Sequence, residues 1–288
     1  MTALVSKWQA VKLLTRMDKP IGTYLLLWPT FWALWVASNG FPNPGLLAIF
    51  ALGVFIMRSA GCVINDYADR HVDGQVKRTQ HRPIVSGQIS AQEALMVFGF
   101  LIGAAIALAI QLSWLTIQYA FVALILATTY PFMKRYTHLP QVVLGAAFSW
   151  GMIMAFAEIQ GEVPIIAWLL FFANLCWTVA YDTMYAMVDR DDDIKIGVKS
   201  TAILFGKYDI RIIGLLQLMV LATLFTVGDM LAFGWPYQLT LVISAGFFCY
   251  QQILIKGRHR DPCFKAFLNN HYVGLIVFIG IVIEYWGY

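Results

Sequence analysis

The chain has 288 residues, of which 60% are hydrophobic and only 12% are charged, and its mean hydropathy is +0.69. Soluble domains carry about 25% charged residues, so this composition excludes an ordinary soluble protein and indicates an integral membrane protein. The net charge is only +4, and we expect neither a nucleic-acid partner nor an obligate protein partner. The four cysteines form no C-x-x-C pair and are expected to be packing residues.

An amphipathic segment at about 8–19 is expected to lie at the membrane interface. Lys7, Lys12 and Arg16 interrupt the apolar residues of this region, which is not the pattern of a secretory signal peptide. Nine apolar segments follow, and we interpret each as a membrane span. They are expected at 21–37, 46–64, 94–112, 114–129, 139–157, 165–181, 210–227, 237–255 and 272–285. The predicted fold is an all-α polytopic membrane protein with nine transmembrane helices.

The basic residues provide a test of this span count. If the N-terminus is cytoplasmic, the later cytoplasmic segments are 65–93, 130–138, 182–211 and 256–271. Nineteen of the 20 Lys and Arg residues lie in these segments or before the first span, and the exception, Arg58, lies inside the second span. Cytoplasmic loops carry such an excess of positive charge. The distribution predicts a cytoplasmic N-terminus, two long cytoplasmic loops and a C-terminus on the opposite side.

Two acidic stretches follow the second and the sixth span. In each stretch polar side chains recur four residues apart, a spacing that places them on one face of a helix. These residues are Asn65, Asp69 and Asp73 in the first stretch and Asp189 and Asp193 in the second. Both stretches contain the pattern D-R-x-x-D, set 120 residues apart, which indicates an internal repeat whose two copies form one site. We predict one domain, 1–288, with two halves at about 21–138 and 139–288.

Carboxylate and amide oxygens are hard ligands that suit Mg²⁺, which usually shares its coordination with substrate phosphates. The candidate metal ligands are Asn65, Asp66, Asp69, Asp73, Asp189 and Asp193. The candidate catalytic residues among them are Asp69, Asp73, Asp189 and Asp193. A solvated acidic loop is the alternative, but the two copies share spacing and position in a chain where charge is scarce. Asp191 and Asp192 point away from the ligand face of a helix and are expected to be solvated.

Basic residues gather on the same side of the predicted bundle and would balance a diphosphate. The candidates for diphosphate binding are Lys77, Arg78, Arg82, Lys134 and Lys199. Arg58 precedes Asn65 by seven residues, which places it about two helical turns deeper in the membrane, where a cation must have a partner. Its partner is either a structural carboxylate, such as Asp69, or a carboxylate of the substrate, and the sequence leaves both open.

Together these motifs resemble those of the UbiA-type intramembrane aromatic prenyltransferases, over essentially the whole chain. N-D-x-x-D-x-x-x-D begins at Asn65, and D-x-x-x-D begins at Asp189. Further stretches narrow the resemblance to members that act on 4-hydroxybenzoate in bacterial ubiquinone biosynthesis. These stretches are Asp18-Lys19-Pro20-Ile21-Gly22, Tyr130-Pro131-Phe132-Met133-Lys134-Arg135, Leu139-Pro140-Gln141, Tyr185-Ala186-Met187-Val188-Asp189 and Lys199-Ser200-Thr201.

The resemblance implies a central cavity between nine helices, capped by the two cytoplasmic loops and open sideways to lipid, in the bacterial inner membrane. It implies Mg²⁺ as cofactor, with polyprenyl diphosphate and 4-hydroxybenzoate as substrates. The polyprenyl group would pass, as an allylic cation, to the ring carbon meta to the carboxylate, giving 3-polyprenyl-4-hydroxybenzoate and diphosphate. The candidates for acceptor binding are Arg58, Arg135, Asp182 and Tyr185.

Other functions fit parts of the pattern. Another member of the superfamily would prenylate homogentisate, a naphthoate, a haem or a glycerophosphate. A cation transporter would place its acids near the bilayer midplane, whereas here they follow the spans at their cytoplasmic ends. CDP-alcohol phosphotransferases keep their acids in one contiguous motif. Zinc hydrolysis is a poor match, because none of the five histidines is paired with another at i, i+4.

Overall fold

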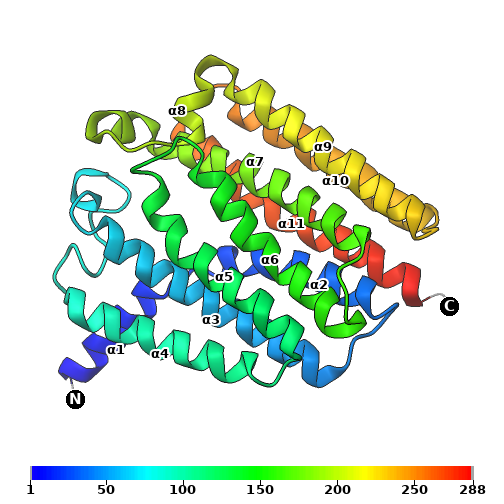
Figure 1. Ribbon diagram of the computed structural model, residues 1–288. Coiled ribbons are helices and arrows are strands. Elements are labelled where there is room, and N and C mark those ends of the chain that lie inside the picture. The colour runs from blue at the N-terminus through cyan, green and yellow to red at the C-terminus, as the bar shows by residue number, and fades with distance from the viewer. Residues whose placement is uncertain (1, 287–288) are drawn as a thin grey trace.

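The computed structural model describes residues 2–286, in which helices pack side by side in one bundle (Figure 1). Two 3₁₀ segments, η1 (Asp73–Gln75) and η2 (Gly206–Tyr208), lie in the connections. No strand occurs among the described residues. The α-helices are α1 (Thr2–Leu14), α2 (Ile21–Ala37), α3 (Pro44–Asp69), α4 (Ala91–Ala109), α5 (Trp114–Met133), α6 (Pro140–Gln160), α7 (Ile165–Ile196), α8 (Thr201–Phe205), α9 (Asp209–Met230), α10 (Trp235–Ile255) and α11 (Arg260–Trp286).

The predicted number and order of the spans are confirmed within residues 2–286. Eight helical segments are long and apolar enough to cross a membrane, and α2 is a ninth, shorter apolar helix. The chain is therefore a multi-pass membrane protein. The two ends of the chain lie at opposite ends of the bundle in Figure 1, as an odd number of crossings requires.

Three helices extend by five residues or more beyond the apolar segments from which they were predicted. α3 continues past residue 64, α7 continues past residue 181, and α11 begins before residue 272. Hydropathy detects only the part of a helix that lies in hydrocarbon, whereas the backbone hydrogen bonds of the helix continue into the aqueous layer. The cytoplasmic segment predicted at 182–211 is therefore not a loop in its first half, because α7 continues to Ile196 and contains the whole second acidic stretch. α7 ends at Ile196, and Gly197 caps it with a φ of +72°, the left-handed conformation that glycine adopts without strain.

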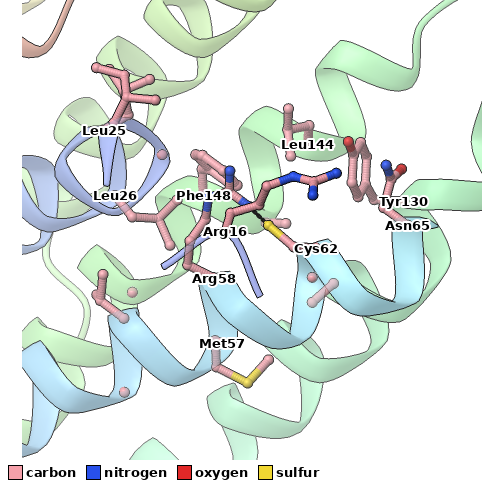
Figure 2. Close-up of a pocket in the computed structure, with 18 of the residues that line it drawn as sticks. Arg16, Leu25, Leu26, Met57, Arg58, Cys62, Asn65, Tyr130, Leu144 and Phe148 are labelled. Carbon is pink, nitrogen blue, oxygen red and sulfur yellow. Dashed lines mark hydrogen bonds between the residues drawn. The ribbon is translucent and has the colours of Figure 1, made fainter. Parts of the chain in front are cut away.

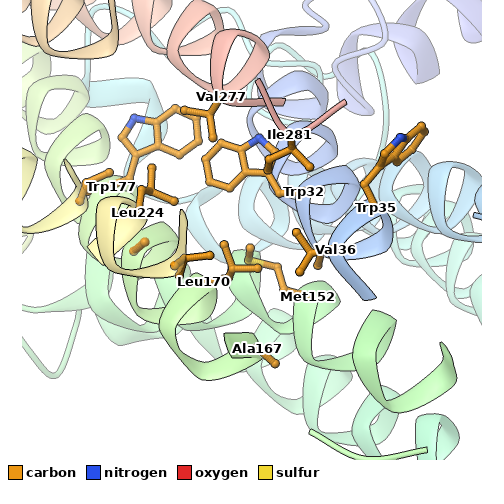
Figure 3. Close-up of a cluster of buried hydrophobic side chains, with 14 of the residues drawn as sticks. Trp32, Trp35, Val36, Met152, Ala167, Leu170, Trp177, Leu224, Val277 and Ile281 are labelled. Atoms are coloured by element: carbon orange, nitrogen blue, oxygen red, sulfur yellow. The ribbon is translucent and has the colours of Figure 1, made fainter. Parts of the chain in front are cut away.

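Aromatic side chains pack the centre of the bundle (Figure 3). Trp32 of α2 stacks on Trp177 of α7 with ring centroids 5.6 Å apart. The indole N–H of Trp32 donates to the carbonyl of Gly274 on α11 at 2.9 Å. A Cβ added at Gly274 would collide with Trp177 and Trp28, so the small residue allows close packing of helices in the membrane. This contact joins α2, α7 and α11 and fixes the helix ends that carry the polar side chains.

α4 lies along the lower edge of the bundle in Figure 1, and α4 and α5 are the least buried of the long apolar helices. Of the apolar stretch of each helix, 6% is buried in α4 and 11% in α5, against 56% in α7. Their side chains therefore face lipid on the outside. On the inside they form one wall of a large cavity, whose other walls include α2, α3 and α6.

Candidate active site

The two acidic stretches meet at one end of the bundle. They line a common polar pocket of about 140 Å³. The pocket-lining residues with the predicted spacing are Asn65, Asp69 and Asp73 from the first stretch and Asp189 and Asp193 from the second. The two halves of the chain thus each contribute one stretch to a single pocket.

Asp73 reaches this pocket without being on the same helix as Asn65 and Asp69. α3 ends at Asp69, and Asp73 begins η1, so the prediction that all three lie on one helical face is wrong for Asp73. The N–H of Val72 donates to the carbonyl of Asp69 at 2.8 Å, which tightens the turn after the helix. The hydroxyl of Thr79 donates to the carbonyl of Asp73 at 2.9 Å, and this bond stabilises the loop that follows α3.

Three of the carboxylates that line the pocket are paired with basic side chains from other segments. Such charge-assisted hydrogen bonds are the stronger ones in proteins. These pairs connect the end of α5 and the loop after α3 with the two acidic stretches. The pairs are Lys134–Asp69, Arg82–Asp73 and Arg78–Asp189.

Arg82 lies among the carboxylates of the first stretch. Its Nη1 atom is 2.7 Å from Asp73 Oδ2, 3.0 Å from Asp66 Oδ1 and 4.0 Å from Asp69 Oδ2. Burial acts to lower the pKa of Arg82, but Asp66 and Asp73 outweigh it and raise that pKa. Burial raises the pKa of Asp73 above its ordinary value, while the charge of Arg82 opposes the rise. The guanidinium therefore stays charged in the pocket.

The donor set fits a divalent ion that shares its coordination with a substrate. Asp69 Oδ1 is buried and has no hydrogen-bond partner among the described residues, so it offers a ready ligand atom. Within residues 2–286, no three His, Cys, Asp or Glu side chains converge closely enough to hold a metal by themselves. Mg²⁺ is usually bound by one or two carboxylates together with phosphate oxygens. The pocket matches that kind of site, and it does not match a closed all-protein metal site.

A much larger cavity, of about 1320 Å³, adjoins the polar pocket. Its walls are mostly apolar, and α4 and α5 contribute small side chains such as Ala105, Ala109 and Ala120. The two spaces adjoin each other, and six residues line both of them. These are Asn65, Arg78, Arg82, Tyr130, Asp182 and Tyr185.

Arg58 projects into the large cavity from α3 (Figure 2). It hydrogen-bonds the thiol of Cys62, and its Nε is buried without a partner among the described residues. Arg58 forms no ion pair with any described carboxylate. The first of the two partners that the sequence left open, a structural carboxylate such as Asp69, is therefore not found in the part of the chain that the structure describes. A Cβ added at Gly22 would collide with the Arg58 guanidinium, so Gly22 leaves the space that Arg58 occupies.

Tyr185 and Asp182 lie where the pocket meets the cavity. The guanidinium carbon of Arg78 lies 4.5 Å from the centre of the Tyr185 ring, and that ring lies 4.6 Å from the ring of Phe267 on α11. Tyr185 thereby orients Arg78 from one side while Asp189 holds it from the other. Asp182 is one helical turn before Tyr185 and shares the wall of the polar pocket with Gln141.

The remaining candidate residues differ in position. Lys134 and Lys199 line the polar pocket, whereas Lys77 and Asp66 line only the large cavity. Arg135 is exposed, lines neither space, and donates to the carbonyl of Ala68. The structure therefore brings most of the candidate residues together but leaves Arg135 outside.

The prediction that Asp192 is solvated is wrong. Asp192 is only 6% exposed and lies 2.9 Å from Arg260 and 3.9 Å from Lys195. As helical spacing predicts, Asp192 does not line the polar pocket, but Arg260 at the start of α11 covers the side to which it points. Asp191, by contrast, is exposed as expected.

Three residues at the site had no role in the sequence analysis. Tyr130 and Gln141 line the polar pocket, and both belong to stretches that carried the family resemblance. Arg16 binds Asp66 from the N-terminal side. In the sequence, Arg16 has only the appearance of an ordinary cytoplasmic basic residue, and no pattern links it to a carboxylate 50 residues away.

Comparison with known proteins gives consistent results. Residues 26–278 match the model of the UbiA prenyltransferase family. The chain is 70% identical to a protein from Colwellia psychrerythraea over 97% of both chains, and 57% identical to one from Yersinia pseudotuberculosis over 98% of both. Both relatives are named 4-hydroxybenzoate octaprenyltransferase.

Solved structures share the fold at low sequence identity. The apo structure of a UbiA homologue from Aeropyrum pernix K1 superposes with a TM-score of 0.80 at 23% identity, covering 91% of this chain and 97% of that one. A UbiA homologue from Archaeoglobus fulgidus, solved with GPP and Mg²⁺ bound, gives a TM-score of 0.72 at 17% identity, covering 95% of this chain and 99% of that one. The helical arrangement is thus that of the UbiA fold.

Proposed function

The chain belongs to the UbiA prenyltransferase family, and from this premise we propose that it transfers a polyprenyl group from polyprenyl diphosphate to 4-hydroxybenzoate. The new bond forms at the ring carbon meta to the carboxylate, and the products are 3-polyprenyl-4-hydroxybenzoate, diphosphate and a proton. The names of relatives that are 70% and 57% identical over nearly the whole chain support this acceptor. The reaction belongs to ubiquinone biosynthesis.

The observation that carries this proposal is that the polar pocket adjoins the large apolar cavity and shares six lining residues with it. A polyprenyl diphosphate has a multiply charged anionic head and a long hydrocarbon tail, and it requires a polar space and an apolar space that adjoin each other. The polar pocket supplies cations and oxygen ligands for the head, and the cavity of about 1320 Å³ supplies apolar walls for the tail and room for the aromatic acceptor.

We propose that Asn65, Asp69, Asp73, Asp189 and Asp193 hold Mg²⁺ together with the donor diphosphate. Mg²⁺, when bound, supplies positive charge that stabilises the departing diphosphate. The family member solved with GPP and Mg²⁺ supports a divalent ion here.

The basic residues would balance the phosphate charge that the metal leaves uncompensated. Arg78, Arg82 and Lys134 already lie in or beside the polar pocket, each bonded to a carboxylate. A diphosphate offers oxygens to the same donors, so the cations exchange a carboxylate partner for a phosphate partner. Lys199 lines the pocket as well, and Lys77 lines the adjoining cavity.

The reaction begins when the allylic C–O bond of the donor breaks and the electron pair leaves with the diphosphate. The cations around the pocket stabilise this leaving group as its charge develops. Tyr185, Phe264 and Phe267 line the cavity, and their aromatic rings would attract the allylic cation. The ring carbon of the acceptor then bonds to the cation, and its proton passes to an aspartate of either stretch or to water.

We propose that Arg58 binds the carboxylate of 4-hydroxybenzoate. Its guanidinium faces the cavity without a protein carboxylate, and a buried cation of this kind requires an anionic partner. Asp182 and Tyr185 at the junction of the two spaces would then contact the phenol end of the acceptor. Arg135 lies outside both spaces, so the acceptor role falls to Arg58.

We further propose that the protein lies in the bacterial inner membrane as one domain with two halves, at about 21–138 and 139–288. The N-terminus and both acidic stretches would be cytoplasmic and the C-terminus external. The clustering of Lys and Arg in alternate loops supports this orientation. The convergence of one acidic stretch from each half on a single pocket supports the two-half organisation.

The acceptor is tested by offering several in parallel. Membranes that contain the protein are incubated with Mg²⁺, octaprenyl diphosphate and either 4-hydroxybenzoate, homogentisate or a dihydroxynaphthoate, and the extracted lipids are identified by mass spectrometry. We expect a prenylated product with 4-hydroxybenzoate and none in membranes without the protein. A product with another acceptor but not with 4-hydroxybenzoate would contradict the proposal, and so would cation uptake into proteoliposomes without any prenylated product.

A further inference from the structure

We propose that the N-terminal head, meaning α1 and the turn after it up to residue 19, is a cap that excludes water from the large cavity, and that the Arg16–Asp66 ion pair holds it closed. The inference rests on the proposed prenyl transfer for its chemical consequence. Its structural part stands on contacts that are independent of any substrate.

The head is docked on the bundle through apolar side chains. Ala10 and Leu14 pack with Val63 of α3, with Ile89 of the loop after η1 and with Ala94 of α4 in one buried cluster. Leu14 is completely buried, which is unusual for a short interfacial helix that only lies on a membrane. α1 is therefore a packed part of the protein at the end of the bundle where both acidic stretches lie.

An ion pair joins the end of the head to the first acidic stretch. Arg16 Nη2 lies 3.0 Å from both carboxylate oxygens of Asp66, and Asp66 is only 1% exposed. Arg82 Nη1 lies 3.0 Å from Asp66 Oδ1 on the other side. Asp66 thus connects the head with Arg82, which also binds Asp73.

The backbone of Arg16 is shaped for this contact. Arg16 has a φ of +56°, in the left-handed region that residues other than glycine seldom adopt. Its Nη1 donates to the carbonyl of Leu13 at 2.7 Å, which closes the turn. The ion pair with Asp66 offsets the unfavourable backbone conformation, so its loss is expected to release the turn and with it the head.

The head forms part of the cavity wall. Leu13, Arg16, Asp18 and Lys19 all line the large cavity, and Figure 2 shows Arg16 among the residues that surround it, with Arg58 and Cys62. Asp66 lines this cavity but not the polar pocket that holds the other acids. Asp66 is therefore assigned as a positioning residue for the head and for Arg82.

Closure has a chemical consequence for prenyl transfer. If water reaches the allylic carbon after the donor C–O bond breaks, its oxygen bonds to that carbon, and polyprenol, diphosphate and a proton result. A closed cap keeps bulk water away from the cation until the acceptor ring reacts. An open cap should raise hydrolysis of the donor relative to transfer.

The structural part is tested by thiol labelling without substrate. Cys62 lines the cavity and is only 6% exposed, whereas Cys249 is exposed, so the experiment uses purified protein that carries Cys249→Ser. The rate of Cys62 modification by a charged, water-soluble thiol reagent is followed by mass spectrometry. Arg16→Ala should raise this rate about tenfold or more, since a hydrogen bond to a charged group contributes enough to shift an opening equilibrium by that factor.

Two further variants and a control accompany Arg16→Ala. Arg16→Lys retains a cation and should label at a rate between those of wild type and Arg16→Ala. Leu14→Ala removes the buried apolar side chain that packs the head on the bundle, and it should also raise the rate of Cys62 labelling. It replaces Arg16→Ala in the test if that variant does not accumulate in the membrane. Lys12 is exposed on the same helix and lines neither the large cavity nor the polar pocket. Lys12→Ala is therefore the control, and its Cys62 should be labelled at the wild-type rate.

The chemical part is tested in the same variants by measuring polyprenol and prenylated product from one donor. Arg16→Ala should raise the ratio of hydrolysis to transfer severalfold, and Lys12→Ala should leave it unchanged. Unchanged Cys62 labelling in both Arg16→Ala and Leu14→Ala would overturn the cap, and an unchanged ratio would overturn its role in excluding water. If wild type transfers no prenyl group, the proposed function fails, and the labelling experiment still decides whether the cap exists.

Discussion

Arg78 donates to both carboxylate oxygens of Asp189, with N–O distances between 2.5 and 3.1 Å. Arg78 follows the first acidic stretch and Asp189 belongs to the second, so this pair joins the two halves of the chain at the polar pocket. In the proposed function Asp189 would be a metal ligand, and Arg78 would donate hydrogen bonds to the diphosphate. In the absence of substrate each neutralises the other, which keeps charged side chains stable beside an apolar cavity.

Arg78→Lys should impair use of the donor although the charge is kept. Lysine cannot reproduce the planar fork by which arginine binds two oxygens at once. Hydrogen bonds to charged groups contribute about 1.5–3 kcal/mol, so kcat/KM for polyprenyl diphosphate should fall about tenfold or more. The acceptor KM should change little. Arg70→Lys, at an arginine that stacks on its neighbour Tyr67 outside both spaces, is the control and should behave like wild type. Equal kcat/KM in Arg78→Lys and wild type would contradict the assignment.

Arg58→Ala should raise the KM for 4-hydroxybenzoate more than the KM for the donor. The guanidinium faces the cavity and has no protein carboxylate, so its loss removes the partner of the acceptor carboxylate. We expect an increase of about tenfold or more, from the loss of a charge-assisted hydrogen bond. Steady-state kinetics with each substrate varied in turn measures the two constants. An equal rise in both would indicate a structural or diphosphate-binding role instead.

Mg²⁺ and diphosphate should stabilise the protein together but not separately. The carboxylates are paired with cations, and within residues 2–286 no three acidic or imidazole side chains form a closed metal site, so either ion alone has an incomplete set of partners. A ligand at 100 times its Kd adds about 2.7 kcal/mol of stability. For a chain of this size that corresponds to a rise in Tm of about 5–10 °C. Thermal unfolding in detergent with Mg²⁺, diphosphate, both, or both plus EDTA provides the measurement. A full shift with Mg²⁺ alone would argue for a preformed metal site.

Trp32→Ala should destabilise the bundle without acting through substrate binding. Trp32 is completely buried, stacks on Trp177 and donates to Gly274, and large-to-small core substitutions of this kind cost about 3–5 kcal/mol. Trp235 is 74% exposed at the start of α10, so Trp235→Ala is a matched control that should unfold at nearly the wild-type temperature. Similar melting temperatures for the two variants would contradict the central position of Trp32.

The spans could be predicted from the sequence because the hydrocarbon layer imposes a simple length and composition on each helix. Helical spacing also identified Asp189 and Asp193 as neighbours on one face, because both lie within one continuous helix. The same reasoning failed for Asp73, because the chain leaves the helix after Asp69, and the contacts of Asp73 with Thr79 and Arg82 then hold it at the pocket. Spacing describes a helix correctly but does not show where the helix ends.

Contacts between distant segments could not be predicted. Nothing in the local sequence indicates that Arg260 covers Asp192, or that Arg16 binds Asp66. Gly22 belongs to a stretch that supported the family resemblance, but its role depends on the space that the Arg58 side chain occupies. Such pairings arise from the packing of one helix against another, and a single sequence carries no record of them.

In the proposed function, one acidic stretch from each half of the chain builds a single Mg²⁺–diphosphate site for prenyl transfer. The most direct measurement is the Mg²⁺-dependent rate of transfer to radiolabelled 4-hydroxybenzoate in proteoliposomes for wild type, Asp69→Ala, Asp189→Ala and Asp191→Ala. Asp191 lies on the same helix as Asp189 but is exposed and lines neither space, so it is the matched control. We predict a fall of about 100-fold or more in the first two variants, a normal rate in Asp191→Ala, and no product from wild type in EDTA. A near-normal rate in Asp69→Ala or Asp189→Ala, or a wild-type rate that resists EDTA, would contradict the account.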